Sequence, residues 1–456
     1  MDRRKPFSRV LIANRGEIAI RILRACRELG LETVAVVSEA DKQSLAALMA
    51  DRAVCIGPPP PIKSYLQIDT IIAAALGTGA QAIHPGYGFL AEQPELAEAC
   101  ERYDLVFIGP RPEQIRRMGD KIWARKMARD IGVPVIPGSE QIHGAEEAVK
   151  AAERLGYPLL IKAAGGGGGR GIKVAENASE LKVFLAEAGA EAHAAFGDDR
   201  LYMEKFIGNA RHIEVQIMGD QRGNLVHLFE RDCSLQRRHQ KMVEESPCPV
   251  LTPHLRQEIC DAALAIARSI KYLSAGTIEF IWDQDRENFY FLEMNTRIQV
   301  EHPVTEFTTG LDLVREQIRI ARGEDLSFRQ DEIRAEGHAI ECRINAESPA
   351  QGFFPCPGQI QEWKAPDDPN LRVDTHCFSG YSIPPYYDSL LAKIISRGRN
   401  RLEAIETMEQ GLAHFHVTGV DTTIPFYQGL LKNAAYRSGA VHTRWIEDFM
   451  ISSKGD

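Results

Sequence analysis

The first 120 residues alternate between short apolar runs and segments with helical spacing. The run at 10–13 predicts a buried strand, and residues 17–29 place apolar side chains three to four positions apart, as one face of a helix requires. Further apolar runs at 33–38, 82–83 and 105–108 repeat the alternation. Because strands that alternate with helices favour a parallel, doubly wound sheet, we predict an α/β arrangement for this region.

A glycine run at 165–169 joins an apolar strand at 158–163 to a second extended segment at 172–175. A dinucleotide-binding fingerprint would need a helix after the loop, and a P-loop would need a Gly-Lys-Ser/Thr sequence that is not present. We therefore predict a flap between antiparallel strands, whose N–H groups can approach phosphates beside Lys162 and Arg170. A solvated hairpin tip would have the same sequence.

Five polar residues alternate with apolar ones near the end of a later predicted strand: Glu293, Asn295, Arg297, Gln299 and Glu301. In an extended chain they share one face, which an ordinary half-buried strand would expose to water. A hairpin turning at 285–287 would place Glu279 opposite Glu293, and like charges so opposed destabilise a sheet unless they are compensated. Two carboxylates and an amide oxygen suit Mg²⁺ or Mn²⁺, so we predict a metal site.

Two other segments contain candidate ligand-binding residues. The stretch 233–245 concentrates four basic side chains in an acidic chain: Arg237, Arg238, His239 and Lys241. By itself this is typical of a solvated charge run, but beside an acidic metal face it predicts the phosphate side of a nucleotide cleft. The segment 84–90 begins with His84 and includes Tyr87, at a strand end where α/β proteins bind ligands; a plain turn is the alternative.

Composition narrows the class of protein. The chain has 456 residues, of which 44% are hydrophobic and 26% charged, which excludes a disordered or collagen-like protein. A net charge of −9 disfavours a broadly basic nucleic-acid-binding surface. Nine scattered cysteines without a CxxC pair indicate reduced thiols and a cytoplasmic location. No apolar run is long enough to span a membrane, so we expect no membrane partner.

Taken together, the motifs resemble biotin carboxylase, an ATP-grasp enzyme. The matching segments span nearly the whole chain: IANRGEIA (12–19), HPGYGFLAE (84–92), MGDK (118–121), IKAAGGGGGRG (161–171), RHIEVQ (211–216), ERDCSLQRRHQKMVEE (230–245), EMNTRIQVEHPVTE (293–306), GHAIECRINAE (337–347) and PPYYDSLLAK (384–393). Other ATP-grasp enzymes would share the nucleotide elements, but they would not carry EMNTRIQVEHPVTE together with ECRINAE. The departures, Cys248, Phe354 and Cys356, lie away from the expected chemistry.

The resemblance implies an α/β (α+β overall) chain with the ATP-grasp fold. It implies a doubly wound parallel-sheet domain over 1–120, an ATP-grasp domain over 121–330 with a mobile Gly-rich lid at about 135–206, and a mixed β domain over 331–456. The implied reaction is ATP-dependent carboxylation of biotin by bicarbonate through carboxyphosphate.

The resemblance also implies roles for individual residues. ATP would be bound by Lys121, Lys162, Gly166, Gly167, Gly168, Gly169, Glu204, Lys205, His212, Gln236 and His239, together with the metal-binding carboxylates. Mg²⁺ or Mn²⁺ would be held by Glu279, Glu293 and Asn295, and bicarbonate by Lys241, Arg297, Gln299 and the Val300 backbone. Glu301 would act as general base, Arg343 would stabilise the biotin enolate, and Tyr87 would line the biotin site. The alternative for Arg343 is an ordinary ion pair, for example with Glu341.

The resemblance further implies a cytoplasmic homodimer, in which biotin arrives on a separate biotin carboxyl carrier protein and leaves through carboxyltransferase subunits. The separate carrier is expected because the sequence contains no Met-Lys-Met biotinylation site. Acetyl-CoA carboxylase and fatty acid biosynthesis would be one setting, and propionyl-CoA or pyruvate would be other acceptors. Two rival functions stay open: an ATP-grasp ligase that joins a carboxylate to an amine, and a non-catalytic nucleotide-binding regulatory protein.

Overall fold

The computed structural model describes residues 6–165 and 172–452. Its N-terminal region is a five-stranded sheet in the order β3-β2-β1-β4-β5, in which every neighbouring pair is parallel. The strands are β1 (Arg9–Ile12), β2 (Glu32–Val37), β3 (Arg52–Cys55), β4 (Ala82–His84) and β5 (Val106–Phe107). The helices are α1 (Gly16–Glu28), α2 (Leu45–Met49), α3 (Ile68–Thr78), α4 (Pro94–Arg102) and α5 (Pro112–Gly119), with short 3₁₀ turns at Glu39–Asp41 and Pro61–Lys63. The predicted doubly wound parallel sheet is confirmed.

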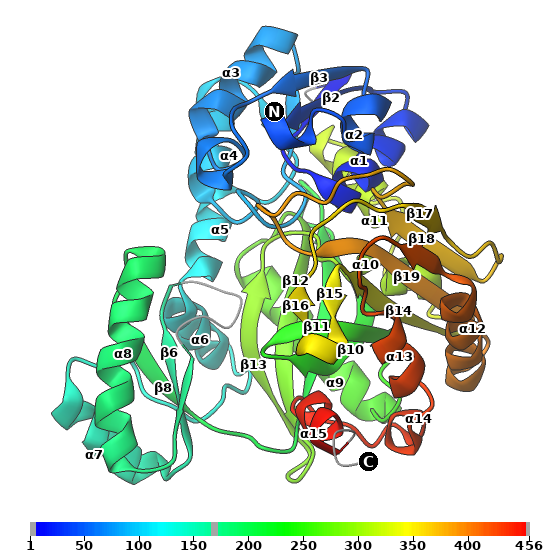
Figure 1. Ribbon diagram of the computed structural model, residues 1–456. Coiled ribbons are helices and arrows are strands. Elements are labelled where there is room, and N and C mark those ends of the chain that lie inside the picture. Colours follow the sequence, from blue (N-terminus) through cyan, green and yellow to red (C-terminus); the bar gives the residue numbers. More distant parts are fainter. Residues whose placement is uncertain (1–5, 166–171, 453–456) are drawn as a thin grey trace.

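A small three-stranded unit stands to one side of the molecule (Figure 1). Its strands β6 (Leu159–Ala163), β7 (Lys173–Ala175) and β8 (Leu201–Lys205) are antiparallel in the order β7-β6-β8. The helices of this part are α6 (Lys121–Asp130), α7 (Ala145–Leu155) and α8 (Ala178–Phe196). The glycine run therefore joins two antiparallel strands, as predicted, although 166–171 lie outside the described residues.

The largest element is an eight-stranded antiparallel sheet in the order β13-β12-β9-β10-β11-β14-β19-β18. Its strands are β9 (Ala210–Gly219), β10 (Leu225–Arg237), β11 (Gln240–Ser246), β12 (Ser274–Asp283), β13 (Asn288–Asn295), β14 (His338–Asn345), β18 (Leu371–Thr375) and β19 (Leu390–Gly398). Two strand pairs flank it: β15 (Glu347–Ser348) with β16 (Phe354–Pro355), and β17 (Glu362–Lys364) with β20 (His416–Thr418). One continuous sheet thus connects the central and C-terminal regions.

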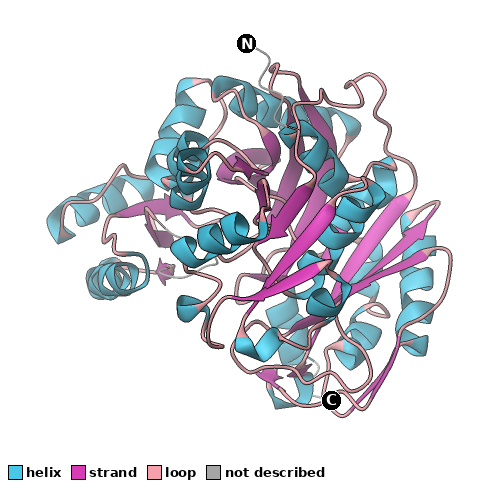
Figure 2. Cartoon of the chain, turned by 90° about the horizontal axis from the view of Figure 1, so that it is seen from above, coloured by secondary structure: helices cyan, strands magenta, loops and turns pink. Residues whose placement is uncertain are grey.

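Helices cover both sides of these strands (Figure 2). They are α9 (Pro253–Ser269), α10 (His302–Thr309), α11 (Leu313–Ala321), α12 (Arg401–His414), α13 (Ile424–Leu430), α14 (Ala434–Ser438) and α15 (Trp445–Ser452), with a 3₁₀ turn at Pro349–Gln351. Among the described residues, none of the helices has the length and apolar character needed to cross a bilayer.

Alternation along β9 determines which face of the large sheet carries the candidate site. Ile213, Val215 and Ile217 are fully buried in one hydrophobic cluster that includes residues of α9. His212 and Glu214, in the alternate positions, point to the opposite face, because successive strand residues alternate. That face carries the polar residues of the candidate site.

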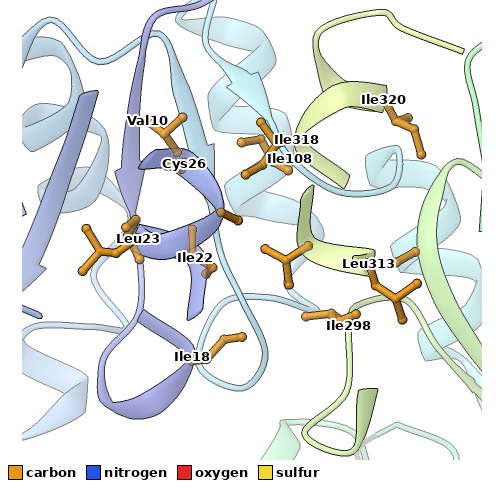
Figure 3. Close-up of a cluster of buried hydrophobic side chains, with 14 of the residues drawn as sticks. Val10, Ile18, Ile22, Leu23, Cys26, Ile108, Ile298, Leu313, Ile318 and Ile320 are labelled. Carbon is orange, nitrogen blue, oxygen red and sulfur yellow. The ribbon is translucent and has the colours of Figure 1, made fainter. Parts of the chain in front are cut away.

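An extended course through 293–301, on which a shared face for the five polar residues depended, holds only as far as Asn295. β13 ends at Asn295, and the chain then turns into α10, which has Pro303 in its first turn. Asn295 pairs with Thr277, and no residue beyond Asn295 has a partner on β12. Ile298 is instead fully buried in the cluster formed by α1, α11 and the N-terminal sheet, close to Ile18 and Leu313 (Figure 3). Burial of this apolar side chain requires a turn after Asn295, so the alternation of polar and apolar residues does not continue as a strand.

Candidate active site

A cleft of about 1170 Å³ lies where the three regions meet. Most of the predicted site residues line it: Tyr87, Lys121, Lys162, Lys205, His212, Gln236, His239, Lys241, Glu279, Glu293, Asn295, Arg297, Gln299, Val300, Glu301 and Arg343. Glu204 does not line the cleft, because its side chain is fully buried behind Lys162. Gly166, Gly167, Gly168 and Gly169 lie outside the described residues.

The two acidic residues predicted to face each other do so. Glu279 on β12 pairs in register with Glu293 on β13, across a hairpin that turns at the predicted position. Each carboxylate has a cation nearby: Lys121 Nζ lies 2.5 Å from Glu293 Oε2, and Lys241 Nζ lies 3.0 Å from Glu279 Oε1. Burial alone would raise the pKa of Glu279, but the charges of Lys241 and His212 outweigh it and lower the pKa well below its ordinary value.

Oxygen ligands for a divalent cation are present at this position. Carboxylates are hard ligands, so the opposed Glu279 and Glu293 fit Mg²⁺ or Mn²⁺. Asn295 does not present its oxygen to Glu279: its Nδ2 donates to Glu279 Oε1 at 2.8 Å, and its Oδ1 accepts from Arg297 at 3.1 Å. A further ligand set, His212, Glu214 and Glu279, has its ligand atoms within 4.8 Å of one another.

Lys241 is surrounded by three carboxylates. Its Nζ lies 2.5 Å from Glu214, 3.0 Å from Glu279 and 2.7 Å from Glu301. Burial alone would lower the pKa of Lys241, but these negative charges raise it well above its ordinary value. The ammonium therefore stays charged and contacts both Glu279, a predicted metal ligand, and Glu301, the predicted base.

Arg343 on β14 is held between two carboxylates. Its Nε donates to Glu244 Oε1 at 2.7 Å, and its Nη2 donates to Glu301 Oε2 at 2.8 Å. The suggested ion pair with Glu341 is wrong, because neither carboxylate oxygen of Glu341 has a hydrogen-bond partner among the described residues. Burial would raise the pKa of Glu301, but Lys241 and Arg343 lower it below its ordinary range, so Glu301 is ionised at neutral pH.

The turn between β13 and α10 is fixed through its polar side chains. Arg297 Nε donates to Glu92 Oε2 at 2.9 Å, and Gln299 Nε2 donates to Glu279 Oε1 at 2.9 Å. Gln299 Oε1 accepts from Arg231 at 3.1 Å, and the side chain of Arg231 is fully buried. These contacts keep the predicted anion-binding groups of the turn at the cleft surface.

Basic and amide side chains line the other part of the cleft. Lys162 Nζ lies 2.5 Å from Glu204, and Gln236 Nε2 lies 3.0 Å from His212 Nδ1. His239 sits in the two-residue turn between β10 and β11, where Arg238 and His239 have φ of 50° and 64°. Such a turn requires positive φ at both central residues, and it directs the hairpin tip into the cleft.

Sequence reasoning missed several buried residues of the site. Lys393 Nζ donates to the Val300 carbonyl at 2.8 Å and pairs with Glu17 at 3.0 Å. Glu17 also accepts a hydrogen bond from Tyr87. Glu17 and Lys393 both occur in the segments that resemble the family, which was the available signal. Glu214 and Glu244 lie in such segments as well, but their contacts with Lys241 and Arg343 became evident only from the structure, because these partners lie far away in the sequence.

Comparison with known families matches the chain in three consecutive parts. The model for the N-terminal domain of biotin carboxylase matches residues 6–115, and the model for its C-terminal domain matches 341–448. Between them, residues 120–329 match the ATP binding domain of the carbamoyl-phosphate synthase L chain.

Similar proteins cover nearly the same length. Biotin carboxylase 1 of Bacillus subtilis is 51% identical over 446 residues, which are 98% of this chain and 99% of that protein. The biotin carboxylase of a Nostoc species is 52% identical over 97% of this chain and 99% of that protein. A pyruvate carboxylase component from Methanothermobacter thermautotrophicus is 50% identical over 97% of this chain and 90% of that protein.

Solved structures agree with these relatives. The biotin carboxylase domain dimer of Hydrogenobacter thermophilus 2-oxoglutarate carboxylase, in complex with MgADP, ADP and bicarbonate, has a TM-score of 0.94 at 47% identity, over 97% of this chain and 98% of that one. Campylobacter jejuni biotin carboxylase, in complex with β,γ-ATP, has a TM-score of 0.95 at 44% identity, over 97% and 99%. With near-complete coverage at about half identity and the residues described above in one cleft, this chain belongs to the biotin carboxylase family.

Proposed function

We propose that the protein is an ATP-dependent ligase that carboxylates biotin with bicarbonate, the first half-reaction of a biotin-dependent carboxylase. One observation carries the proposal: Glu301 lies in hydrogen-bond contact with both Lys241 and Arg343, beside the opposed carboxylates Glu279 and Glu293. A base, two cations and a metal-binding pair in one cleft are what phosphoryl transfer to bicarbonate requires.

Bicarbonate would bind at the turn between β13 and α10. Lys241, Arg297 and Gln299 reach the cleft there, and Val300 lines it, with its carbonyl held by Lys393. The incoming anion competes with Glu301 for Lys241. Glu301, relieved of part of that positive charge, becomes basic enough to take the bicarbonate proton.

The deprotonated oxygen then attacks the γ-phosphorus of ATP, which gives carboxyphosphate and releases ADP. Lys121 and Lys162 supply positive charge at the phosphates, and Glu279 and Glu293 would hold the metal. A bound Mg²⁺ or Mn²⁺ supplies neutralisation of the phosphate charge. Carboxyphosphate breaks down to CO₂ and phosphate, the released phosphate takes the proton of the biotin ureido N–H, and the ureido nitrogen attacks the CO₂. Arg343 stabilises the enolate form of biotin, with Tyr87 along the wall of its site.

The biotin would be carried on a separate biotin carboxyl carrier protein and passed to carboxyltransferase subunits. We also propose the division into regions 1–120, 121–330 and 331–456, a homodimer and a cytoplasmic location, with acetyl-CoA carboxylase and fatty acid biosynthesis as one setting. The relatives named above support a carboxylase system in general, whereas the acceptor depends on the carboxyltransferase.

ADP release by the purified protein tests this function directly. The assay contains Mg²⁺ and ATP, with and without bicarbonate and free biotin at high concentration. We expect release that requires bicarbonate and rises with biotin. ADP release that responds to an amine substrate instead would support a different ATP-grasp ligase, and nucleotide binding without any turnover would support a regulatory protein.

A further inference from the structure

Two buried glutamates lie directly behind Arg343 without enough hydrogen-bond partners. Glu244 on β11 faces Glu341 on β14 in register, and neither side chain is exposed to solvent. Glu244 Oε2 and both carboxylate oxygens of Glu341 have no hydrogen-bond partner among the described residues. Buried polar atoms are almost always paired, and two ionised carboxylates facing each other across a sheet repel.

The cations near Glu341 are bound to groups other than Glu341. The charged groups that face Glu341 are Lys393 from β19, Glu301 from the turn before α10, and Arg343 and Glu244. Lys393 is bound to Glu17 and the Val300 carbonyl, and Arg343 to Glu244 and Glu301. Helix α12 contributes no charge there, because its apolar residues pack with Ile340 and Cys342, on the opposite face of β14.

Burial and mutual repulsion both favour a proton at this place. Burial raises the pKa of Glu341 well above its ordinary value against the attraction of Lys393, and Glu244 and Glu301 add to the increase. Burial also raises the pKa of Glu244 to about 7, against the attraction of Arg343. One proton placed between the two carboxylates removes one negative charge and gives partners to two of the three unpaired oxygens.

We propose that Glu244 and Glu341 bind one proton between them, and that this pair of positioning residues holds Arg343 in the cleft. Glu341 carries the proton and donates it to Glu244 Oε2, while Glu244 stays anionic and accepts from Arg343 through Oε1. The inference deepens the proposed function and rests on it, because it concerns the residue expected to stabilise the biotin enolate. Neither glutamate lines the cleft, so neither touches a substrate.

The pair makes the biotin step depend on pH. Above the pH at which the pair of glutamates loses this proton, a second negative charge lies behind Arg343. It competes with the developing enolate for the same guanidinium. Biotin-stimulated turnover then falls with rising pH, while bicarbonate-dependent ATP cleavage without biotin does not show the decline that the pair causes. Glu341→Gln preserves a neutral hydrogen-bond donor, so this variant keeps biotin-stimulated turnover at neutral pH and loses the alkaline decline that the pair causes.

Infrared spectroscopy of the full-length protein detects the proton without reference to activity. A buried carboxylic acid has a C=O stretching band separate from that of a carboxylate, and the band shifts in deuterium oxide. We expect such a band in the wild-type protein at neutral pH, its loss in Glu341→Gln, and its retention in Glu230→Gln. Glu230 is a matched control: it is fully buried in the same sheet and pairs with Arg256 at 2.7 Å, away from the cleft. Glu341→Leu gives the same test if the glutamine variant does not fold.

Kinetics test the positioning role. Glu244→Gln should lower biotin-stimulated kcat/KM by about tenfold, because one charged hydrogen bond to Arg343 is weakened, with a smaller effect on ADP release without biotin. A band that survives in Glu341→Gln overturns the shared proton. A band that is lost while the pH profile of the biotin step stays unchanged overturns the positioning of Arg343. The infrared result does not depend on turnover. A band that behaves as expected in a protein that does not carboxylate biotin would therefore overturn the proposed function and leave the shared proton in place.

Discussion

Lys393 Nζ donates a hydrogen bond of 2.8 Å to the carbonyl oxygen of Val300. The lysine side chain is fully buried on β19, and Val300 lies in the turn between β13 and α10. The same ammonium pairs with Glu17 of the N-terminal region, and Glu17 accepts from Tyr87. One buried lysine therefore ties three regions of the chain to the turn that presents Gln299 and Glu301.

Substitution Lys393→Met should destabilise the protein strongly. It leaves Glu17 buried with its main cation partner removed, and breaking one partner from a buried ion pair costs about 3–5 kcal/mol. Chemical denaturation monitored by circular dichroism measures the loss. Lys182→Met, an exposed lysine on α8, is the control and should change stability little. Equal losses in the two variants would show that the buried pair has no special role.

Substitution Glu301→Gln should remove the general base while leaving the nucleotide site intact. We expect bicarbonate-dependent ADP release to fall by about 10²–10⁴-fold, the usual contribution of a positioned base. Calorimetric titration with MgADP should give an affinity close to that of the wild type. Turnover near the wild-type rate would exclude Glu301 from this role.

Arg343→Lys tests whether geometry or charge matters at this position. A lysine keeps the charge but cannot donate to Glu244 and Glu301 in the fixed planar arrangement of the guanidinium. We expect biotin-stimulated turnover to fall more than bicarbonate-dependent ATP cleavage does. Measurement of both rates on one preparation gives the ratio, and a parallel decrease would instead indicate a structural role.

Removal of either opposed carboxylate should weaken metal binding. For Glu279→Gln and Glu293→Gln we expect the Mg²⁺ concentration that supports half-maximal ADP release to rise by about tenfold or more, because each change removes an anionic oxygen ligand. Glu287→Gln, in the exposed turn of the same hairpin, is the matched control. An unchanged Mg²⁺ requirement in both site variants would place the metal elsewhere in the cleft.

Acid should destabilise the fold through Glu306. Burial alone would raise its pKa, but Arg21 at 2.8 Å and Arg372 at 2.6 Å lower the pKa to about 2. A carboxyl whose pKa is lower in the folded state stabilises the fold above the unfolded-state pKa and loses that contribution as the pH falls toward the folded value. We expect about 3 kcal/mol of stability to disappear between about pH 4.5 and pH 2. Denaturation of wild type and Glu306→Gln across this range should show a shallower acid dependence in the variant.

The sequence predicted local relationships better than distant ones. The Glu279–Glu293 register follows from a short hairpin, so it could be derived by symmetry, and the structure confirms it. The partner of Arg343 could not be derived, because Glu244 reaches it through pairing of β11 with β14. The turn at 296–301 was missed because it depends on burial of Ile298 between helices α1 and α11, which no local pattern indicates.

The pairing of β11 with β14 also bears on where the chain could be divided. Residues 322–337, between α11 and β14, form a linker in the sequence, but the hydrogen bonds of the large sheet continue across it, with Val243 opposite Cys342 and Ser246 opposite Ala339. Two polypeptides made by cutting there would each expose a strand edge, and exposed edges pair with other strands. A protease cut in this linker should therefore leave the two parts associated as a single particle. Halves synthesised separately should instead aggregate or associate with each other.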